Sequence, residues 1–181
     1  MRRWTGVVAL LGLALAGCQG VQELFPGREG GPPTVIDRSG GAASSGMVER
    51  KVAFPADTYA RLAKHGSATI KGRLTYTTPQ GRTLIGAGET VSIAPATPYS
   101  AEAAEVALAG KRIEPADPRA RAYTHHATTD ARGYFVAHDI PAGVFYVAGS
   151  VRLPGGHSRS PLILRQVEIG KGQTRQVDLS R

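Results

Sequence analysis

The sequence of 181 residues has one cysteine, and aromatic residues make up only 6% of it. A single cysteine cannot form a disulfide within the chain, so the stability of the protein must come from an ordinary hydrophobic core. Long helices are also disfavoured, because 23 glycines and 12 prolines are more typical of strands and turns. The length fits one folded domain.

Motifs that bring reactive side chains together are absent from the sequence. It has no HExxH pair, no G-x-S-x-G turn and no phosphate-binding G-x-x-x-x-G-K-S/T loop. His125 and His126 are adjacent, so in a strand their side chains point to opposite faces and cannot chelate one ion. His138 and His157 stand apart from that pair. We therefore expect no metal, no cofactor and no catalytic residue.

The balance of charges is basic, with a formal net charge of +8. The arginines are scattered and lack the interleaved aromatic residues that read nucleic-acid bases, which argues against a nucleic-acid partner. A basic protein is instead attracted to polymers that carry phosphate or carboxylate groups.

The N-terminus has the organisation of a targeting segment. Arg2 and Arg3 precede a mostly apolar run over residues 4–15, which is well short of the roughly 20 residues that span a bilayer. Residues 15–18 have the sequence LAGC, with small residues directly before the cysteine. This segment resembles a bacterial lipoprotein signal peptide with its lipobox.

The resemblance implies removal of residues 1–17 by cleavage between Gly17 and Cys18, followed by lipidation of Cys18. Acyl chains on Cys18 would anchor the protein in a membrane, since two or more chains suffice for stable attachment. Gln19, where an aspartate would retain such proteins at the inner membrane, favours the outer membrane of the bacterial envelope. An ordinary secretory signal and an uncleaved signal anchor are the alternatives.

Composition divides the rest of the chain into three segments. Residues 18–46 comprise the lipidated cysteine and a tether, because 13 of the 28 residues that follow the cysteine are Gly, Pro or Ser. Such a segment cannot bury enough apolar surface to fold. Residues 47–67 form a lead-in with a short helix expected over residues 55–65. Residues 68–181 form the folded domain.

The domain alternates between short strands and Gly/Pro turns. Apolar residues recur at every second position over residues 68–76, which is typical of a half-buried strand. A helical insert is expected over residues 100–112 with Ser100 as its N-cap. Strand character resumes over residues 121–129, and the last strand is expected over residues 173–179. These features predict an all-β fold, an antiparallel Greek-key β-sandwich of seven to eight strands with a short helical insert.

The same alternation predicts which side chains form the core. Residues at the inward positions of sandwich strands pack between the two sheets. The predicted inward set is Ile70, Leu74, Val91, Ile93, Phe135, Phe145, Val147, Val167 and Val177.

Several short motifs carry a further resemblance. In chain order they are Gly72-Arg73-Leu74, Leu84-Ile85-Gly86-Ala87, Val91-Ser92-Ile93, Thr129-Asp130-Ala131-Arg132-Gly133-Tyr134-Phe135 and Ile140-Pro141-Ala142-Gly143-Val144-Phe145. Together they resemble a carboxypeptidase regulatory-like domain, a prealbumin (transthyretin-like) sandwich, over most of the domain. The resemblance implies the fold and leaves the function open. The related hydroxyisourate hydrolase ends in Tyr-Arg-Gly-Ser, whereas this chain ends in Asp178-Leu179-Ser180-Arg181.

The main functional hypothesis is a non-catalytic, lipid-anchored envelope protein. A lipid anchor, a long tether and a domain without converging reactive side chains suit a module that presents its sandwich to an envelope protein partner. The module would face the periplasm or the cell surface. The expected contact surface comprises Tyr99, Lys111, Arg112 and Arg119.

Two alternatives stay open. A module that binds carbohydrate or a cell-wall polysaccharide needs an aromatic platform, and Tyr134 and Tyr146 are expected to flank one another on the outer face of neighbouring strands. The other candidates for such a platform are Tyr59, Tyr76, Tyr99 and Tyr123. A hydrolase on the transthyretin-like fold is the second alternative, with His126 as the residue to test.

Overall fold

The computed structural model describes residues 47–181, and the expected signal peptide, Cys18 and the tether lie outside this range. The helices are α1 (Ala56–Ala60), α2 (Pro98–Leu108) and α3 (Pro118–Arg121). The strands are β1 (Met47–Val48), β2 (Ala68–Thr77), β3 (Thr83–Ile85), β4 (Thr90–Pro95), β5 (Arg112–Ile113), β6 (His125–Thr128), β7 (Tyr134–Ile140), β8 (Gly143–Gly149), β9 (Ile163–Ile169), β10 (Thr174–Gln176) and β11 (Leu179–Ser180). None of these helices is both long enough and apolar enough to span a bilayer.

One sheet, which we call the β2 sheet, is built around the ten-residue strand β2. β7 and β3 pair with one side of β2 in antiparallel orientation, and β10 and β11 pair with its other side in parallel. We expected the last strand as one antiparallel strand over residues 173–179. It is instead parallel to β2 and divided into β10 and β11. Both pieces keep one register on β2, with Thr174 opposite Thr69 and Leu179 opposite Leu74.

A close approach at Gly72 lets the last strand lie against β2. A Cβ atom at Gly72 would lie 1.9 Å from the Val177 carbonyl oxygen. The Val177 N–H donates to the Lys71 carbonyl oxygen at 2.8 Å beside this contact. Any side chain at position 72 would force the two strands apart.

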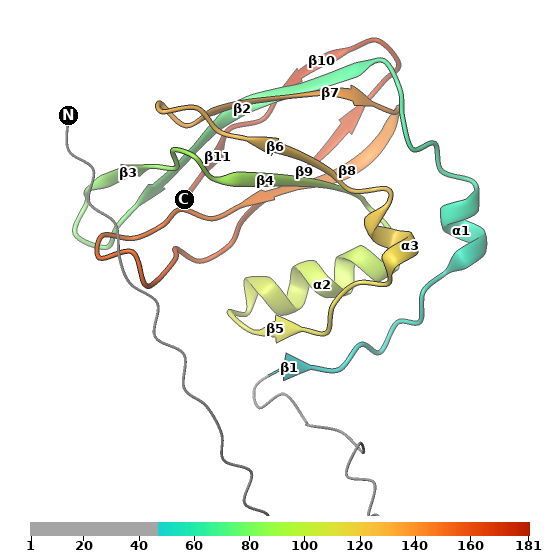
Figure 1. The fold of residues 1–181 in the computed structure, drawn as a ribbon, viewed down its shortest axis with the longest axis horizontal. Helices are drawn as coiled ribbons and strands as arrows, with labels where there is room; N and C mark the ends of the chain where they lie inside the picture. Colours follow the sequence, from blue (N-terminus) through green and yellow to red (C-terminus); the bar gives the residue numbers. More distant parts are fainter. Residues whose placement is uncertain (1–46) are drawn as a thin grey trace, which may run out of the picture. The chain divides into compact units, whose positions relative to one another are not determined.

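The other sheet, the β4 sheet, has the order β6–β4–β8–β9 and is antiparallel throughout. Side chains from both sheets form one buried cluster between them. All nine predicted core residues belong to it, and the most exposed of them, Val167, is only 9% exposed. The predicted all-β sandwich is confirmed, and Figure 1 shows its two layers.

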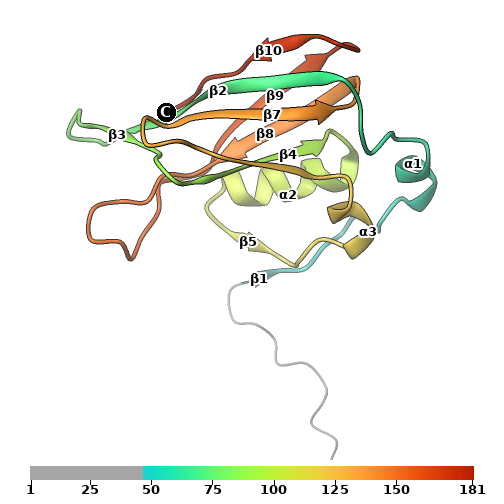
Figure 2. The ribbon, with the colours of Figure 1, turned by 45° about the horizontal axis from the view of Figure 1, so that its top comes forward.

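Helices cover only one of the two outer faces of the sandwich. α2 lies against the outer face of the β4 sheet, and no helix of residues 47–181 crosses β10, β2 or β7 (Figures 1 and 2). Tyr59, Tyr99 and Ala120 join α1, α2 and α3 in a second buried cluster. We call these helices, with β1 and β5, the helical layer. We call the uncovered outer face of the β2 sheet the open face.

The helix starts differ from the prediction because proline begins two of the helices. Thr97, not Ser100, is the N-cap of α2: the Thr97 hydroxyl accepts the Ser100 N–H at 3.2 Å, and the Ser100 hydroxyl accepts the Thr97 N–H at 2.9 Å. Pro98 is the first helical residue, where a missing N–H costs nothing. Pro118 begins α3 in the same way behind the Asp117 cap.

Two further boundaries differ from the prediction. The strand expected over residues 121–129 begins only at His125, because α3 continues through Arg121. The lead-in helix, expected over residues 55–65, is shorter and ends at Ala60. The helical insert itself is confirmed as α2, followed by Gly110 at a φ of 74°.

Candidate functional site

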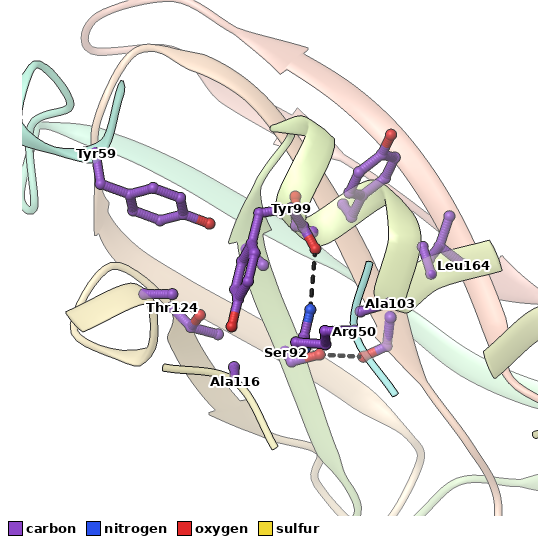
Figure 3. A pocket seen from close by; sticks show the side chains of 14 residues that line it. Arg50, Tyr59, Ser92, Tyr99, Ala103, Ala116, Thr124 and Leu164 are labelled. Atoms are coloured by element: carbon purple, nitrogen blue, oxygen red, sulfur yellow. Dashed lines mark hydrogen bonds between the residues drawn. The ribbon is translucent and has the colours of Figure 1, made fainter. Parts of the chain in front are cut away.

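A pocket of about 200 Å³ lies between α2 and the outer face of the β4 sheet (Figure 3). Six of its fourteen lining residues are alanines, so short side chains leave space between the helix and the strands. Three of the tyrosines predicted as platform candidates line it: Tyr59, Tyr99 and Tyr146. The pocket is therefore mainly apolar, with aromatic rings in its walls.

Two of the tyrosine hydroxyls at the pocket already have partners within the domain. The Tyr59 hydroxyl lies 3.2 Å from the Thr97 hydroxyl, and the Tyr99 hydroxyl accepts the Asp117 N–H at 2.8 Å. Burial raises the pKa of Tyr59, and the hydrogen bond with Thr97 only partly offsets this rise. No carboxylate or imidazole of residues 47–181 lines the pocket, so its only ordinary acid–base groups are the tyrosine hydroxyls.

Arg50 of the lead-in lies at the edge of this pocket. Its guanidinium lies over the Tyr99 ring, 4.2 Å from the ring centroid, and donates to the Tyr99 carbonyl oxygen at 3.2 Å (Figure 3). Its Nε donates to the Glu114 carbonyl oxygen at 3.1 Å. The side chain thus joins the lead-in to α2 and to the segment after β5.

Two carboxylates hold the backbone around Arg50. Glu102 of α2 accepts the Lys51 N–H at 2.6 Å and also the Val52 N–H, and Glu114 accepts the Arg50 N–H at 3.2 Å. β1 adds a two-residue parallel pairing with β5. We call residues 47–52 with these two glutamates the N-terminal clamp.

Four of the outward side chains of the open face form two cross-strand pairs. Arg73 of β2 lies opposite Tyr134 of β7, and Lys71 lies opposite Val136. They face away from the core because their chain neighbours, among them Phe135, are buried. Tyr134 is 47% exposed and Val136 is 50% exposed, so the patch presents aromatic and apolar surface to solvent.

A hollow of about 220 Å³ extends this patch toward the last strand. Gln176 and Asp178 line it from the β10 side, and Lys71 and Tyr134 line it from β2 and β7. Gly72, Phe135 and Val136 complete its lining. Ring face, donors and acceptors therefore occur within one shallow depression.

A tight turn positions Tyr134 at the start of β7. The Asp130 carboxylate accepts the N–H groups of Tyr134 and Arg132, each at 2.8 Å, and Gly133 supplies a φ of 82°. The hydrogen bond from the Tyr134 backbone is the main reason that the pKa of Asp130 is lowered. The side chain that fixes this turn is thus held in its ionised form.

Two guanidinium groups lie against the Tyr134 ring. Arg73 is 5.1 Å and Arg132 is 5.7 Å from the ring centroid. The Arg73 Nε donates to the Arg132 carbonyl oxygen at 2.9 Å, which fixes its side chain beside the ring. Both separations fall within the range of cation–π attraction.

A separate buried carboxylate supports the loops at one end of the sandwich. Glu89 is 5% exposed and accepts hydrogen bonds from the Arg152 N–H and from the Arg159 guanidinium. Burial pushes the pKa of Glu89 upward, but these two partners outweigh burial and lower it. Glu89 therefore stays ionised as a structural ion pair.

The histidines do not converge. His125 and His126 are consecutive in β6, as predicted, and His125 is stacked edge-on against His65 with ring centroids 6.0 Å apart. Burial, and secondly the charge of His65, lower the pKa of His125. No group of three or more His, Cys, Asp or Glu residues within 47–181 is placed to hold a metal ion.

The predicted contact surface is only partly at the surface. Tyr99 is buried, with 4% of it exposed, because its ring packs in the helical layer. Lys111 and Arg112 are exposed. Arg119 is exposed but forms a bidentate pair with Asp117. The expectation that Tyr99 faces a partner is corrected by this packing.

The predicted pairing of two tyrosines is also wrong. Tyr134 lies on β7 of the β2 sheet, whereas Tyr146 lies on β8 of the β4 sheet. Both side chains point outward, but from opposite faces of the sandwich. Tyr134 instead has the guanidinium groups of Arg73 and Arg132 beside its ring, and neither was predicted there. Arg73 nevertheless occupies an outward position of a strand that was predicted correctly.

No model of a protein family matches the chain, and no curated protein matches it. A solved structure from Pseudomonas aeruginosa, described as a candidate carbohydrate-binding protein, is similar to it with 28% identity and a TM-score of 0.59. The match covers 72% of this chain and 99% of that one. A second such protein, from Bacteroides uniformis, has 11% identity and a TM-score of 0.33, covering 64% of this chain and 41% of that one.

Proposed function

We propose that residues 47–181 form a non-catalytic carbohydrate-binding module. The observation that carries this proposal is the likeness to the Pseudomonas aeruginosa protein, which extends over 99% of that protein's chain. A match of this extent is to the whole sandwich with its additions and not to a strand motif.

We place the carbohydrate on the open face. Sugar rings present apolar C–H faces that pack on aromatic rings, and their hydroxyls pair with side chains that donate and accept. Tyr134 offers a half-exposed ring, and Gln176, Asp178 and Lys71 line the adjoining hollow. The open face also lets a polymer continue past the site in both directions.

The pocket under α2 suits a polysaccharide less well. Its tyrosine hydroxyls at positions 59 and 99 are already hydrogen-bonded to Thr97 and Asp117. A sugar entering it would have to replace those bonds, and unpaired buried polar groups are costly. Contact with an envelope protein through Lys111 and Arg112 stays a prediction, as a different use of the helical layer.

We further propose that lipid on Cys18 holds this module at the outer membrane of a bacterial envelope. The lipobox-like sequence before Cys18 and the Gly/Pro/Ser-rich segment after it support this proposal. Such an arrangement keeps a polysaccharide-binding domain within reach of the envelope polymers. Replacement of Cys18 by serine should abolish incorporation of labelled palmitate and leave an unprocessed precursor.

The binding proposal is tested with the lipidated protein in detergent, run by electrophoresis through gels that contain one polysaccharide each. We expect retardation by at least one polymer, and we expect Tyr134→Ala to weaken binding about tenfold, or ~1.4 kcal/mol, through the loss of ring packing. Leu108→Ala is the matched control, because Leu108 is 49% exposed but lies on α2. Free migration in every polymer, or equal losses in both variants, would contradict the proposal.

A further inference from the structure

We infer that the polysaccharide bound at the open face is acidic and carries carboxylate groups on its sugar units. This inference rests on the proposed function and specifies the chemistry of its ligand. Its basis is that three cationic side chains near Tyr134 form no ion pair within residues 47–181. They are Lys71, Arg73 and Arg132.

Two of the three cations, Arg73 and Arg132, lie against the exposed ring, and Lys71 lines the adjoining hollow together with it. Lys71 and Arg73 occupy alternate positions of β2, so their Cα atoms are about 6.6 Å apart on the same face. Arg132 comes from the turn before β7, and its guanidinium lies 5.7 Å from the Tyr134 ring centroid. A sugar that packs on this ring would therefore lie within reach of several positive charges.

These cations have no carboxylate partner in the domain. Within residues 47–181 there are three ion pairs, Arg50–Glu102, Arg119–Asp117 and Arg159–Glu89. The first two belong to the helical layer, and the third supports loops at one end of the sandwich. None of them uses a side chain of the open face, so the positive charges there remain available to a ligand.

The two acidic residues nearest the patch do not form ion pairs with it. One Asp130 oxygen is occupied by two backbone N–H groups of its own turn. Asp178 accepts a weak hydrogen bond from Gln176 at 3.4 Å, and no ion pair of the described chain includes it. Asp178 is placed to accept a sugar hydroxyl while the cations meet the carboxylates.

Arg73 is the side chain best arranged for this role. Its Nε is used by the Arg132 carbonyl oxygen at 2.9 Å, which fixes the guanidinium plane and leaves the terminal nitrogens directed elsewhere. A guanidinium held in this way pairs with a carboxylate at a lower entropic cost than a free lysine does. Arg73 should therefore contribute more to binding than Lys71.

The test compares two forms of one polymer, polygalacturonate and its methyl ester, because esterification removes the charge and keeps the sugar backbone. The lipidated protein in detergent is run through gels that contain either form, and a gel with dextran serves as an unrelated neutral polymer. We expect strong retardation by polygalacturonate alone, and we expect it to weaken as NaCl rises from 50 to 500 mM, because surface charges are screened. Arg73→Gln should weaken binding about tenfold, and Lys71→Gln should weaken it less.

Arg112→Gln is the matched control, since it removes one exposed positive charge from the helical layer. An equal loss in this variant would overturn the inference, because attraction would then depend on net charge alone.

Arg132→Gln is a second variant in case Arg73→Gln fails to fold, which thermal melting followed by circular dichroism would reveal. Equal binding to the ester and to polygalacturonate would overturn the inference that the ligand is acidic, but it would not contradict the carbohydrate-binding proposal. No retardation by any of these or other polymers would overturn both.

Discussion

The two outer faces of the sandwich differ in the charge of the side chains that they present. On the β4 sheet the outward side chains that line the pocket under α2, such as Ser92, Ala148 and Tyr146, are uncharged. On the β2 sheet the outward positions include Lys71 and Arg73, which are long and charged. A helix can cover the first face without burying a charge, whereas a helix over the second would bury unpaired charges. Charge at alternate strand positions thus decides which face is covered.

Two tyrosines provide the sharpest test of this comparison. Tyr99 is 4% exposed in the helical layer, and Tyr134 is 47% exposed on the open face. Tyr99→Ala should lower the free energy of unfolding by about 3–5 kcal/mol, because it empties a buried site and removes the partner of the Asp117 N–H. Tyr134→Ala should change it by no more than about 0.5 kcal/mol. Urea denaturation measures both, and similar losses would show that the two faces do not differ as described.

The N-terminal clamp gives a smaller effect confined to the covered side. Glu102→Gln weakens the acceptor of the Lys51 and Val52 N–H groups, so we expect a loss of about 1 kcal/mol. Hydrogen exchange should accelerate over residues 47–52 and stay unchanged in β2. Glu105→Gln on the same helix is the control, because its side chain is exposed. Equally faster hydrogen exchange in both variants would show that Glu102 does not hold residues 47–52 in place.

The smallest effect concerns pH. Hydrogen bonds from the Arg119 side chain and backbone lower the pKa of Asp117 to about 2 from 3.8. A lowered pKa means that the folded state favours the ionised form, so this contribution is present above pH 3.8 and is lost as the pH falls toward 2. Asp117→Asn should therefore lower the melting temperature slightly at pH 6 and leave it unchanged near pH 2. Asp57→Asn, at an exposed position of α1, is the control. If the difference in melting temperature persisted near pH 2, the stabilising role of the ionised Asp117 carboxylate would be contradicted.

The core could be predicted from sequence because a strand has a period of two. Ile70, Leu74 and Phe135 occupy inward positions that alternation alone identifies, and each is buried. The parallel orientation of the last strand could not be predicted in this way, because alternation says which face a residue occupies and not which strand lies beside it. That pairing depends on Gly72, whose partner Val177 is far along the chain.

The helix starts could have been predicted from a capping residue followed by proline, a signal that the prediction did not use. Thr97-Pro98 and Asp117-Pro118 each place a capping side chain before a proline, which is the usual start of a helix and not only a barrier to one. The burial of Tyr99 had no such local signal. It depends on contacts with Phe54 and Tyr59, which come from the lead-in more than 35 residues earlier.

The candidate site was predictable in part. Tyr134 was among the tyrosines proposed for a platform, and its outward position follows from the burial of Phe135 beside it. Its neighbours were not predictable, because Arg73 reaches Tyr134 only through the pairing of β2 with β7. The sequence thus identifies the ring, and the sheet register supplies the charges around it.

The N-terminal clamp has a mechanical consequence. A pull on the chain from the N-terminal side enters the domain at Met47 and loads the two-residue pairing of β1 with β5 and the bonds to Glu102 and Glu114 first. Those bonds can separate while the sheets stay intact, since both sheets begin after residue 67. Release of residues 47–52 would add about 20 Å of extended chain. The domain can therefore yield to tension at its N-terminal end and keep its open face folded.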